Sequence, residues 1–236
     1  MMHGLILAGG RGSRLAADGV ATPKALVEIA GRPQIAHLIE TFSRLGCVSI
    51  TCMVRDDIPL DWAGWAAEHG ADVRRCRTPS SLHTLVAGLA AAPPGPVFCA
   101  MVDTVMPAAD WQRLYRGVAA ALDAGAHAAL AITPFAEDDH PLYVERGAAG
   151  QVLAISDDSP PRSSPRSVTG GVYGFAPAAR RLAAVALGSL HRMRAFLKLL
   201  VEIGAPVRAV EVPRIIDLDH KRDLEAAAAW LAAAEA

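Results

Sequence analysis

An apolar run that stops at a pair of glycines constrains the fold of this chain more than any other feature of its sequence. Residues 3–8 read His-Gly-Leu-Ile-Leu-Ala, and Gly9-Gly10 follow directly. A short apolar run bounded by glycine is typical of a strand that is buried on both faces, as the strands of parallel sheets are. The sequence therefore predicts a parallel sheet whose first strand leads into a glycine-rich loop.

Strand-like and helix-like segments alternate through the first 134 residues. We expect strands at 47–54, 71–76, 96–102 and 126–133, and helices at 33–45, 80–92 and 108–124. Alternation of this kind is typical of a parallel sheet with helices on both of its faces.

The pattern changes after residue 134. Short strand-like pieces at 142–145, 152–155 and 168–175 are followed by helical patterns at 177–187 and 190–203, a strand at 206–212 and a closing helix. No linker separates two equal parts, so we expect one α/β domain over 1–236 with an antiparallel flap inserted after residue 134.

The composition excludes several classes of protein. Hydrophobic residues make up 52% of the 236 residues, which excludes a disordered chain. The formal net charge is −1 and no basic run occurs, so no nucleic-acid partner is expected. No apolar run of ~20 residues is present, so no membrane partner is expected either. The four cysteines form no Cys-x-x-Cys pair, which favours reduced thiols and a cytoplasmic location.

The loop after the first strand combines glycines with two cations. Residues 9–14 read Gly-Gly-Arg-Gly-Ser-Arg, and Pro23-Lys24 follow. Glycines let backbone N–H groups approach an anion closely, because no Cβ intervenes. Arg14 and Lys24 add positive charge that suits the oxygens of a triphosphate.

Other interpretations of a glycine loop fit less well. A P-loop ends in Gly-Lys-Ser/Thr, which this loop lacks. A dinucleotide-binding fingerprint needs a third glycine after Gly10-Arg11-Gly12, and Leu15 follows instead, which leaves an NAD-dependent oxidoreductase as a distant alternative. A plain turn explains the glycines but not the Pro23-Lys24 that follows.

A carboxylate follows the apolar run 96–102. Asp103 would lie at the carboxyl end of a parallel strand, where open α/β sheets bind their ligands. A carboxylate beside a phosphate-binding loop is a natural ligand for Mg²⁺, which proteins hold by one or two carboxylates together with substrate phosphates. The alternative is an aspartate that caps the next helix.

The N-terminal motifs resemble those of the nucleotidyltransferase family, which includes sugar-1-phosphate nucleotidyltransferases and phosphocholine-type cytidylyltransferases. Every position of the pattern LAGGxGxRL…PK…GxP is matched, by Leu7, Ala8, Gly9, Gly10, Gly12, Arg14, Leu15, Pro23, Lys24, Gly31 and Pro33. The resemblance implies a Rossmann-like, GT-A-like three-layer α/β/α fold with a mixed, mostly parallel central sheet and a small antiparallel flap. It also implies a nucleotide-binding half at 1–134 and an acceptor-binding flap with C-terminal helices at 135–236.

The resemblance assigns roles to individual residues. Those implied in nucleotide binding are Leu7, Ala8, Gly9, Gly10, Gly12, Ser13, Arg14, Lys24, Ser80, Ser81 and Asp103. Arg14 and Lys24 would be catalytic by stabilising charge on the phosphates. Asp103 and Asp219 would be the metal ligands, with Asp217 as the alternative to Asp219.

Some of these residues have a second interpretation. Ser80 and Ser81 also suit the N-cap of the predicted helix, and the two roles are compatible. Thr169, Gly170 and Gly171 resemble the glycine-rich acceptor strand of the family, although a β-bulge explains such glycines equally well. Two segments depart from the hexose-phosphate members: residues 80–85 are closer to cytidylyltransferases, and residues 155–160 lack a Glu-Lys-Pro lysine, for which Arg162 or Arg166 could substitute.

The expected function is Mg²⁺-dependent nucleotidyl transfer from an NTP to a small phosphate monoester, with a sugar 1-phosphate as first choice and pyrophosphate as the leaving group. The alternatives are a cytidylyltransferase for an alcohol phosphate or phosphonate such as phosphocholine, and a nucleotide-binding regulatory protein without turnover. The expected partners are the NTP and a small phosphorylated acceptor, and a homo-oligomer is compatible with the sequence.

Overall fold

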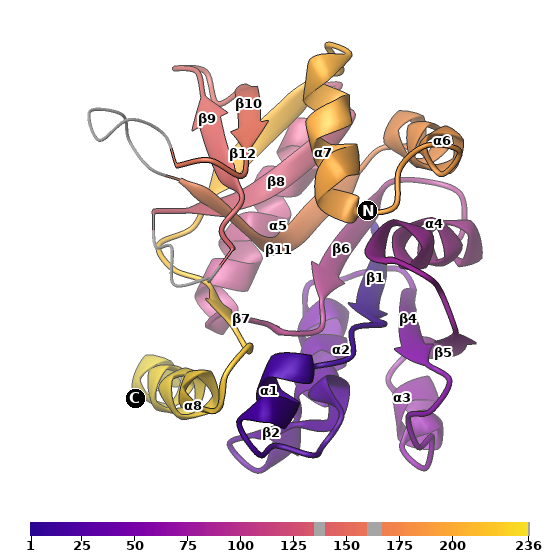
Figure 1. Ribbon diagram of the computed structural model, residues 1–236, viewed down its shortest axis with the longest axis vertical. Coiled ribbons are helices and arrows are strands. Elements are labelled where there is room, and N and C mark those ends of the chain that lie inside the picture. The colour runs from indigo at the N-terminus through magenta and orange to yellow at the C-terminus, as the bar shows by residue number, and fades with distance from the viewer. Residues whose placement is uncertain (135–139, 160–166, 236) are drawn as a thin grey trace.

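The computed structural model describes residues 1–134, 140–159 and 167–235, and its centre is a nine-stranded sheet (Figure 1). The strands of this sheet are β1 (His3–Ala8), β4 (Ile50–Arg55), β5 (Ala71–Cys76), β6 (Val97–Met101), β8 (Ala128–Thr133), β9 (Tyr143–Arg146), β10 (Val152–Ser156), β11 (Val168–Phe175) and β12 (Val207–Glu211). The helices are α1 (Ser13–Ala17), α2 (Gln34–Arg44), α3 (Ala63–Glu68), α4 (Ser81–Ala91), α5 (Ala108–Asp123), α6 (Pro177–Ala186), α7 (Met193–Glu202) and α8 (Lys221–Glu235), with a 3₁₀ turn η1 at Lys24–Leu26.

The sheet is mixed and mostly parallel, as predicted. Strand β1 pairs in parallel with both β4 and β6, and β5 and β12 extend the parallel arrangement beside β4 and β8. Strand β11 runs antiparallel to its two neighbours, β6 and β8. Because β6 and β8 both oppose β11, they point the same way, and their carboxyl ends meet at one edge of the sheet.

Helices cover both faces because the strand residues alternate. Ile6 and Ala8 of β1 belong to one core cluster with residues of α2 and α5, whereas Leu5 and Leu7 belong to a second cluster with residues of α4, α6 and α7. Figure 1 shows these two groups of helices on opposite sides of the sheet. The predicted three-layer Rossmann-like fold is therefore confirmed.

The antiparallel flap also lies where the sequence predicts it. Strands β9 and β10 form an antiparallel hairpin, and β9 joins the main sheet where Tyr143 pairs with Val168 of β11. Helix α7 packs on β10. The hairpin and α7 together form a wall beside the first residues of β11.

Two short ladders were not predicted. Strand β2 (Glu28–Ile29) pairs with β3 (Arg32–Pro33), and β7 (Thr104–Val105) pairs with β13 (Ile216–Asp217). The second ladder brings the chain after β12 back to the end of β6. Helix α8 then packs on a small cluster that includes Ile29, Val105 and Leu218.

Two differences from the predicted elements have local causes. Strand β4 begins at Ile50 rather than at residue 47, because the chain turns at Gly46 (φ +79°) and Val48 bonds only the carbonyl of Met2. Helix α3 was not predicted, since it is only six residues long and contains Gly64.

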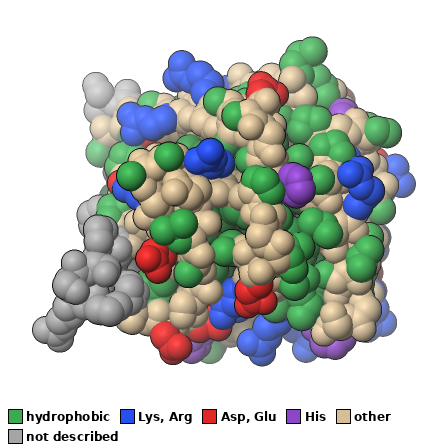
Figure 2. Space-filling model, turned by 90° about the horizontal axis from the view of Figure 1, so that it is seen from above, with side chains coloured by type: hydrophobic (Ala, Val, Ile, Leu, Met, Phe, Trp, Pro, Cys, Tyr) green, Lys and Arg blue, Asp and Glu red, His purple; other side chains and the backbone are tan. Residues whose placement is uncertain are grey.

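The surface and the helices give two further observations. Figure 2 shows one face of the molecule, on which cationic and acidic side chains are interspersed rather than gathered by sign. None of the helices in the described part of the chain combines the length and the apolar character that a bilayer crossing needs.

Candidate active site

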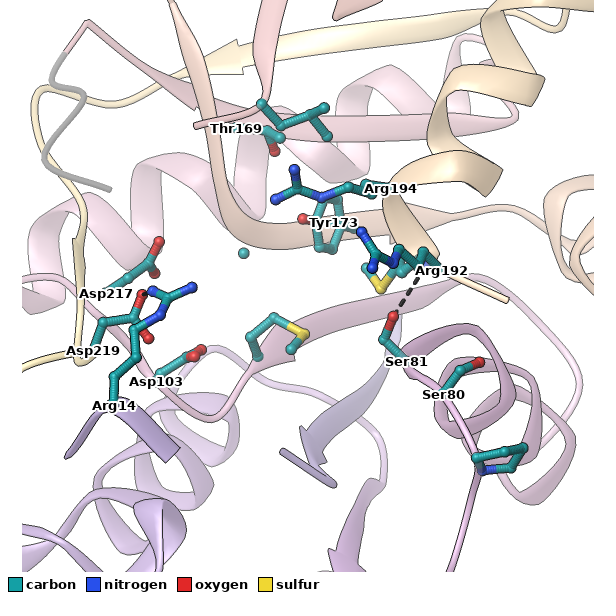
Figure 3. A pocket seen from close by; sticks show the side chains of 15 residues that line it. Arg14, Ser80, Ser81, Asp103, Thr169, Tyr173, Arg192, Arg194, Asp217 and Asp219 are labelled. Carbon is teal, nitrogen blue, oxygen red and sulfur yellow. Dashed lines mark hydrogen bonds and ion pairs between the residues drawn. The ribbon is translucent and has the colours of Figure 1, made fainter. Parts of the chain in front are cut away.

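Three segments that carry candidate functional residues meet at the carboxyl edge of the parallel strands. The glycine loop follows β1, Asp103 follows β6, and β11 begins at the same edge because it runs in the opposite direction. A cleft of about 540 Å³ opens there (Figure 3). It is lined by Arg14, Pro79, Ser80, Ser81, Met101, Asp103, Leu142, Thr169, Gly171, Tyr173, Arg192, Met193, Arg194, Asp217 and Asp219.

The glycine loop borders a smaller cavity of about 140 Å³ that adjoins this cleft through shared residues. Gly12 has φ +62° and stands at the start of α1, and its Cβ position lies 3.4 Å from Cβ of Lys24. Nothing lies within 4 Å of a Cβ built on Gly10, so this part of the loop faces open space. The loop therefore exposes backbone beside the Lys24 side chain, as an anion site requires.

The structure distributes the predicted loop residues between cavity and core. Those that line the smaller cavity are Leu7, Gly10, Gly12, Ser13, Arg14, Lys24 and Asp103. Ala8 is buried in the core, and a Cβ on Gly9 would lie 3.1 Å from the Thr84 side chain. Ala8 and Gly9 thus support the loop from behind.

Lys24 joins two carboxylates. Its Nζ donates to Oδ2 of Asp103 at 2.7 Å and to Oδ1 of Asp219 at 2.8 Å. The side chain of Lys24 is only 9% exposed. Burial by itself would lower the pKa of Lys24, but the two carboxylates outweigh burial and raise the pKa above its ordinary value. The ammonium therefore stays charged between the two aspartates.

Arg14 completes this group of charges. Its Nη1 donates to the Oδ2 atom of Asp219, the carboxylate that also binds Lys24. The same aspartate is anchored through its backbone, because its N–H and that of His220 donate to the Asp223 carboxylate at 3.0 and 2.6 Å. Asp223 thus caps the start of α8, and its charge lies in the first turn, where the helix dipole favours an anion.

The ladder between β7 and β13 explains how residues so far apart in sequence meet. Asp217 pairs with Thr104, and the N–H of Leu218 donates to the carbonyl of Asp103 at 2.9 Å. Asp219 is thereby placed beside Asp103, while Asp217 lines only the larger cleft. The geometry favours Asp219 over Asp217 as the partner of Asp103.

The donor set fits a magnesium ion with substrate phosphates. Asp103 and Asp219 place carboxylate oxygens around one Nζ atom, so these oxygens are close enough to share a cation. The described residues contain no group of three or more His, Cys, Asp or Glu side chains arranged to hold a metal. Two carboxylates suffice for Mg²⁺, which completes its shell with phosphate oxygens and water.

Ser80 and Ser81 lie on the opposite wall and have structural roles as well. Ser80 is the N-cap of α4, and its Oγ accepts from the N–H of His83 at 3.5 Å. The Oγ of Ser81 accepts from the N–H of Met193 at 3.0 Å, which ties the start of α4 to the start of α7. Both residues line the cleft, so capping and ligand contact are compatible here.

The glycines of β11 are required by packing. Gly171 has φ +68°, and its Cβ would lie 2.5 Å from Oγ1 of Thr104. A Cβ on Gly170 would lie 2.3 Å from the Ile215 side chain. The pairing of β11 with β8 is irregular between Thr169 and Tyr173, so a bulge is present at these glycines. Thr169 and Gly171 line the cleft, whereas Gly170 does not.

Sequence reasoning missed three polar residues of the cleft. Arg192 and Arg194 lie at the start of α7, and Tyr173 lies on β11 (Figure 3). Burial raises the pKa of Tyr173, so its hydroxyl stays protonated. The signal for the arginines was their place at the start of a predicted helix, where cations are unfavourable unless an anion is near. Arg162 and Arg166 lie outside the described residues.

Known proteins share short sequence stretches with this chain. A mannose-1-phosphate guanyltransferase of Pichia angusta is 47% identical over 53 residues, which cover 22% of this chain and 15% of that protein. The mannose-1-phosphate guanyltransferase of Saccharomyces cerevisiae is 45% identical over 53 residues, with the same coverage. The chain thus matches less than a fifth of the length of these curated relatives.

Solved structures share the whole fold. The inositol-1-phosphate CTP transferase from T. maritima superimposes with a TM-score of 0.80 at 13% identity, covering 100% of this chain and 96% of that one. The CTP:phosphocholine cytidylyltransferase from Streptococcus pneumoniae gives a TM-score of 0.75 at 17% identity, covering 97% and 98%. The family model of the MobA-like NTP transferase domain matches residues 4–170. Since this match includes more than half of the chain, the protein belongs to the MobA-like NTP transferase domain family of nucleotidyltransferases.

Proposed function

We propose that this protein transfers a nucleotidyl group from an NTP to a small phosphate monoester, with a sugar 1-phosphate as the first-choice acceptor. The observation that carries the proposal is the position of Lys24, which binds Asp103 and Asp219 beside an open glycine loop. This arrangement offers cations and exposed backbone to phosphates, and carboxylates to a metal ion, at one edge of the sheet.

The reaction forms one bond and breaks one. An acceptor phosphate oxygen attacks the α-phosphorus of the NTP, the bond from that phosphorus to the bridging oxygen of the β-phosphate breaks, and pyrophosphate leaves. The acceptor is already anionic, so no side chain needs to remove a proton. Catalysis by this chain is therefore alignment and neutralisation of charge.

Each residue has a defined part in that chemistry. The glycine loop binds the phosphates through backbone N–H groups, and Lys24 and Arg14 stabilise the charge that develops on them. Asp103 and Asp219 would hold Mg²⁺, which when bound supplies charge neutralisation and alignment of the triphosphate. Ser80 and Ser81 stand on the opposite wall, where the nucleobase would lie.

The two parts of the chain divide the substrates in this proposal. Residues 1–134 supply the glycine loop, Lys24 and Asp103, and residues 135–236 supply β11, α7 and Asp219. Both parts contribute strands to one sheet, so we treat 1–236 as one nucleotidyltransferase domain. We place it in the cytoplasm, where its four free cysteines would stay reduced.

A cytidylyltransferase is the second candidate. The structural neighbours include a CTP transferase and a phosphocholine cytidylyltransferase, and residues 80–85 are closer to the latter class than to hexose-phosphate members. The acceptor would then be an alcohol phosphate or a phosphonate. A regulatory protein that binds NTP without turnover is the third candidate.

Pyrophosphate release tests all three. Purified protein with Mg²⁺ is assayed with CTP, UTP, GTP, ATP and dTTP against sugar 1-phosphates, inositol 1-phosphate, phosphocholine and aminoethylphosphonate. We expect release with one pair, its loss in Asp103→Asn, and no loss in Asp123→Asn, an exposed aspartate at the end of α5. Nucleotide binding without release for any pair would favour the regulatory protein, and absence of nucleotide binding would overturn the proposal.

A further inference from the structure

The cleft has an acidic end and a basic end. Asp103, Asp217 and Asp219 lie on one side in Figure 3, and the guanidinium groups of Arg192 and Arg194 enter from α7 on the other. The side chains of Thr169 and Tyr173 lie near the basic end, on β11. A ligand that fills the cleft therefore meets cations at both ends, because Arg14 lines the cleft beside the aspartates and Lys24 lines the adjoining smaller cavity.

The two arginines of α7 differ in their partners. Arg194 donates from Nη1 to Oδ1 of Asp157 at 2.9 Å and from Nη2 to the carbonyl of His140 at 3.0 Å. Lys198 binds the other oxygen of Asp157 at 2.5 Å. The guanidinium of Arg192 makes no hydrogen bond or ion pair with the residues that the structure describes.

The location of these charges is unfavourable without a ligand. Arg192 is the N-cap of α7 and Arg194 lies in its first turn, where the helix dipole is positive. The N–H of Met193 is already bonded to Ser81. An anion in the cleft would relieve the repulsion, and a planar guanidinium pairs well with a phosphate.

The anion in question differs from the triphosphate. The NTP phosphates have their own cations at the acidic end, in Lys24 and Arg14. The segment 155–160 has no lysine, and its Asp157 binds the cations of α7 instead. The cations that the described residues place on this side of the cleft are therefore those at the start of α7.

We propose that Arg192 and Arg194 bind the phosphate of the acceptor, and that Asp157 is a positioning residue that holds Arg194 in place. The assignment rests on the proposed function, because it concerns the second substrate of the same reaction. It predicts that the kinetic parameters for the acceptor and for the NTP separate in variants of α7.

The test compares three variants with one control. In Arg192→Gln and Arg194→Gln we expect the acceptor KM to rise about tenfold or more, while the NTP KM and the NTP Kd from calorimetry change less than about twofold. Arg194→Lys should recover part of the loss. The control is Arg181→Gln, an exposed arginine on α6. This control should keep the wild-type acceptor KM.

A double-mutant cycle tests the positioning role of Asp157. Asp157→Asn should raise the acceptor KM less than Arg194→Gln does, and should add nothing in the Arg194→Gln background, because it acts only through Arg194. A purely structural role would instead lower the melting temperature and would change the NTP and acceptor parameters together. Additive effects of the two substitutions on the acceptor KM would overturn the positioning role.

A binding measurement covers the case in which no acceptor in the panel reacts. Inorganic phosphate is titrated into protein saturated with Mg²⁺ and an NTP analogue whose α–β bridge is methylene. We expect binding that weakens about tenfold in Arg192→Gln and in Arg194→Gln. Equal binding by the wild type and both variants, or no phosphate binding at all, would overturn the assignment while leaving nucleotide binding intact. Absence of analogue binding would identify the proposed function as the step that failed.

Discussion

The two ends of the cleft treat charge differently. At the acidic end, which we propose binds the NTP and call the nucleotide end, Lys24 and Arg14 bind Asp103 and Asp219, so cations and carboxylates neutralise one another within the protein. At the basic end, which we propose binds the acceptor and call the acceptor end, Arg194 binds Asp157, whose side chain is 54% exposed, and Arg192 has no partner among the described residues.

From this difference in charge pairing we infer which substrate each end binds. The nucleotide end keeps its geometry through internal ion pairs, and its glycine loop, Arg14 and Lys24 match the family pattern. The acceptor end departs from the hexose-phosphate members in segment 155–160, and its Arg192 has no anionic partner among the described residues. We therefore expect nucleotide-end substitutions to affect catalysis with any acceptor, and acceptor-end substitutions to affect acceptor binding.

The largest effect is expected from Lys24→Met, which leaves two half-buried carboxylates without their shared cation. The turnover number should fall roughly 100- to 1000-fold, the range for removal of one group that stabilises transition-state charge. Pyrophosphate release measures it, with Lys198→Met as the matched control. A Lys24→Met variant that kept its turnover number but lost stability would contradict this prediction, because Lys24 would then have a structural role and no catalytic one.

The next prediction concerns the close approach of β11 to β7, which lies between the two ends of the cleft. Gly171→Ala should lower the free energy of unfolding by about 2–3 kcal/mol, because it adds a left-handed strain and a contact with Thr104. Gly204→Ala has a similar φ of +71° with open space around it and should cost about 1 kcal/mol. Urea denaturation measures both. Equal losses would show that the close approach to β7 contributes nothing.

An arginine at the edge of the sheet opposite the cleft serves the fold rather than a ligand. Arg180 of α6 donates to the carbonyls of Leu89, Ala92, Pro93 and Gly95 and thereby caps the end of α4. Arg180→Ala should lower the free energy of unfolding by about 2 kcal/mol, since it leaves these carbonyls without a charged donor. The acceptor KM should not change. A raised acceptor KM in this variant would mean that α4 and α7 move together.

A smaller effect is expected where the C-terminal helix fixes Asp219. Asp223→Ala removes the acceptor for the N–H groups of Asp219 and His220, and should cost about 1 kcal/mol of stability. Turnover should fall only several-fold, because Lys24 and Arg14 still bind Asp219. Thermal denaturation and pyrophosphate release measure the two effects. A loss of turnover as large as that of Lys24→Met would contradict this ranking.

The smallest effect sets the baseline for an ion pair outside the cleft. Arg32 binds Glu40, and this contact lowers the pKa of the Glu40 carboxyl. The Arg32 side chain is 43% exposed, so solvent screens the ion pair, and Glu40→Gln should cost only about 0.2–1 kcal/mol at neutral pH. A carboxyl whose pKa is lowered in the folded state stabilises the fold fully at pH values above its ordinary pKa of about 4.3. This stabilisation is lost as the pH falls through the lowered pKa, so the difference in stability between the variant and the wild type should vanish below about pH 4.3. Urea denaturation from pH 7 to pH 3 tests the sign.

Much of the fold could be predicted because it depends on local patterns. Strand β1 has the predicted bounds, and α2, α4 and α5 differ from their predicted ranges by at most one residue at each end. Their apolar residues repeat with the period of the element, and glycine or proline marks their ends. The glycine loop and Lys24 were recognisable because their function requires particular residues in a fixed order.

The rest depends on contacts between distant parts of the chain. The ladder of β7 and β13 has only two residues per strand, too few for any periodic signal, although it places Asp219 beside Asp103. The helix that carries Arg192 and Arg194 was predicted, but which of its residues enter the cleft depends on how α7 packs on β10. The serines at 80 and 81 suggested a cap from sequence, and the bond from Met193 to Ser81 emerged only in three dimensions.

The Lys24 bridge has a consequence for the life of the protein before it meets any substrate. Many small proteins with a structural metal site fold only when the metal ion is supplied. In this protein the ammonium of Lys24 neutralises Asp103 and Asp219 as soon as the chain has folded, before any metal ion binds. We therefore expect the protein to fold and to stay folded without magnesium. Under the proposed function, removal of the ion should stop nucleotidyl transfer without unfolding the protein.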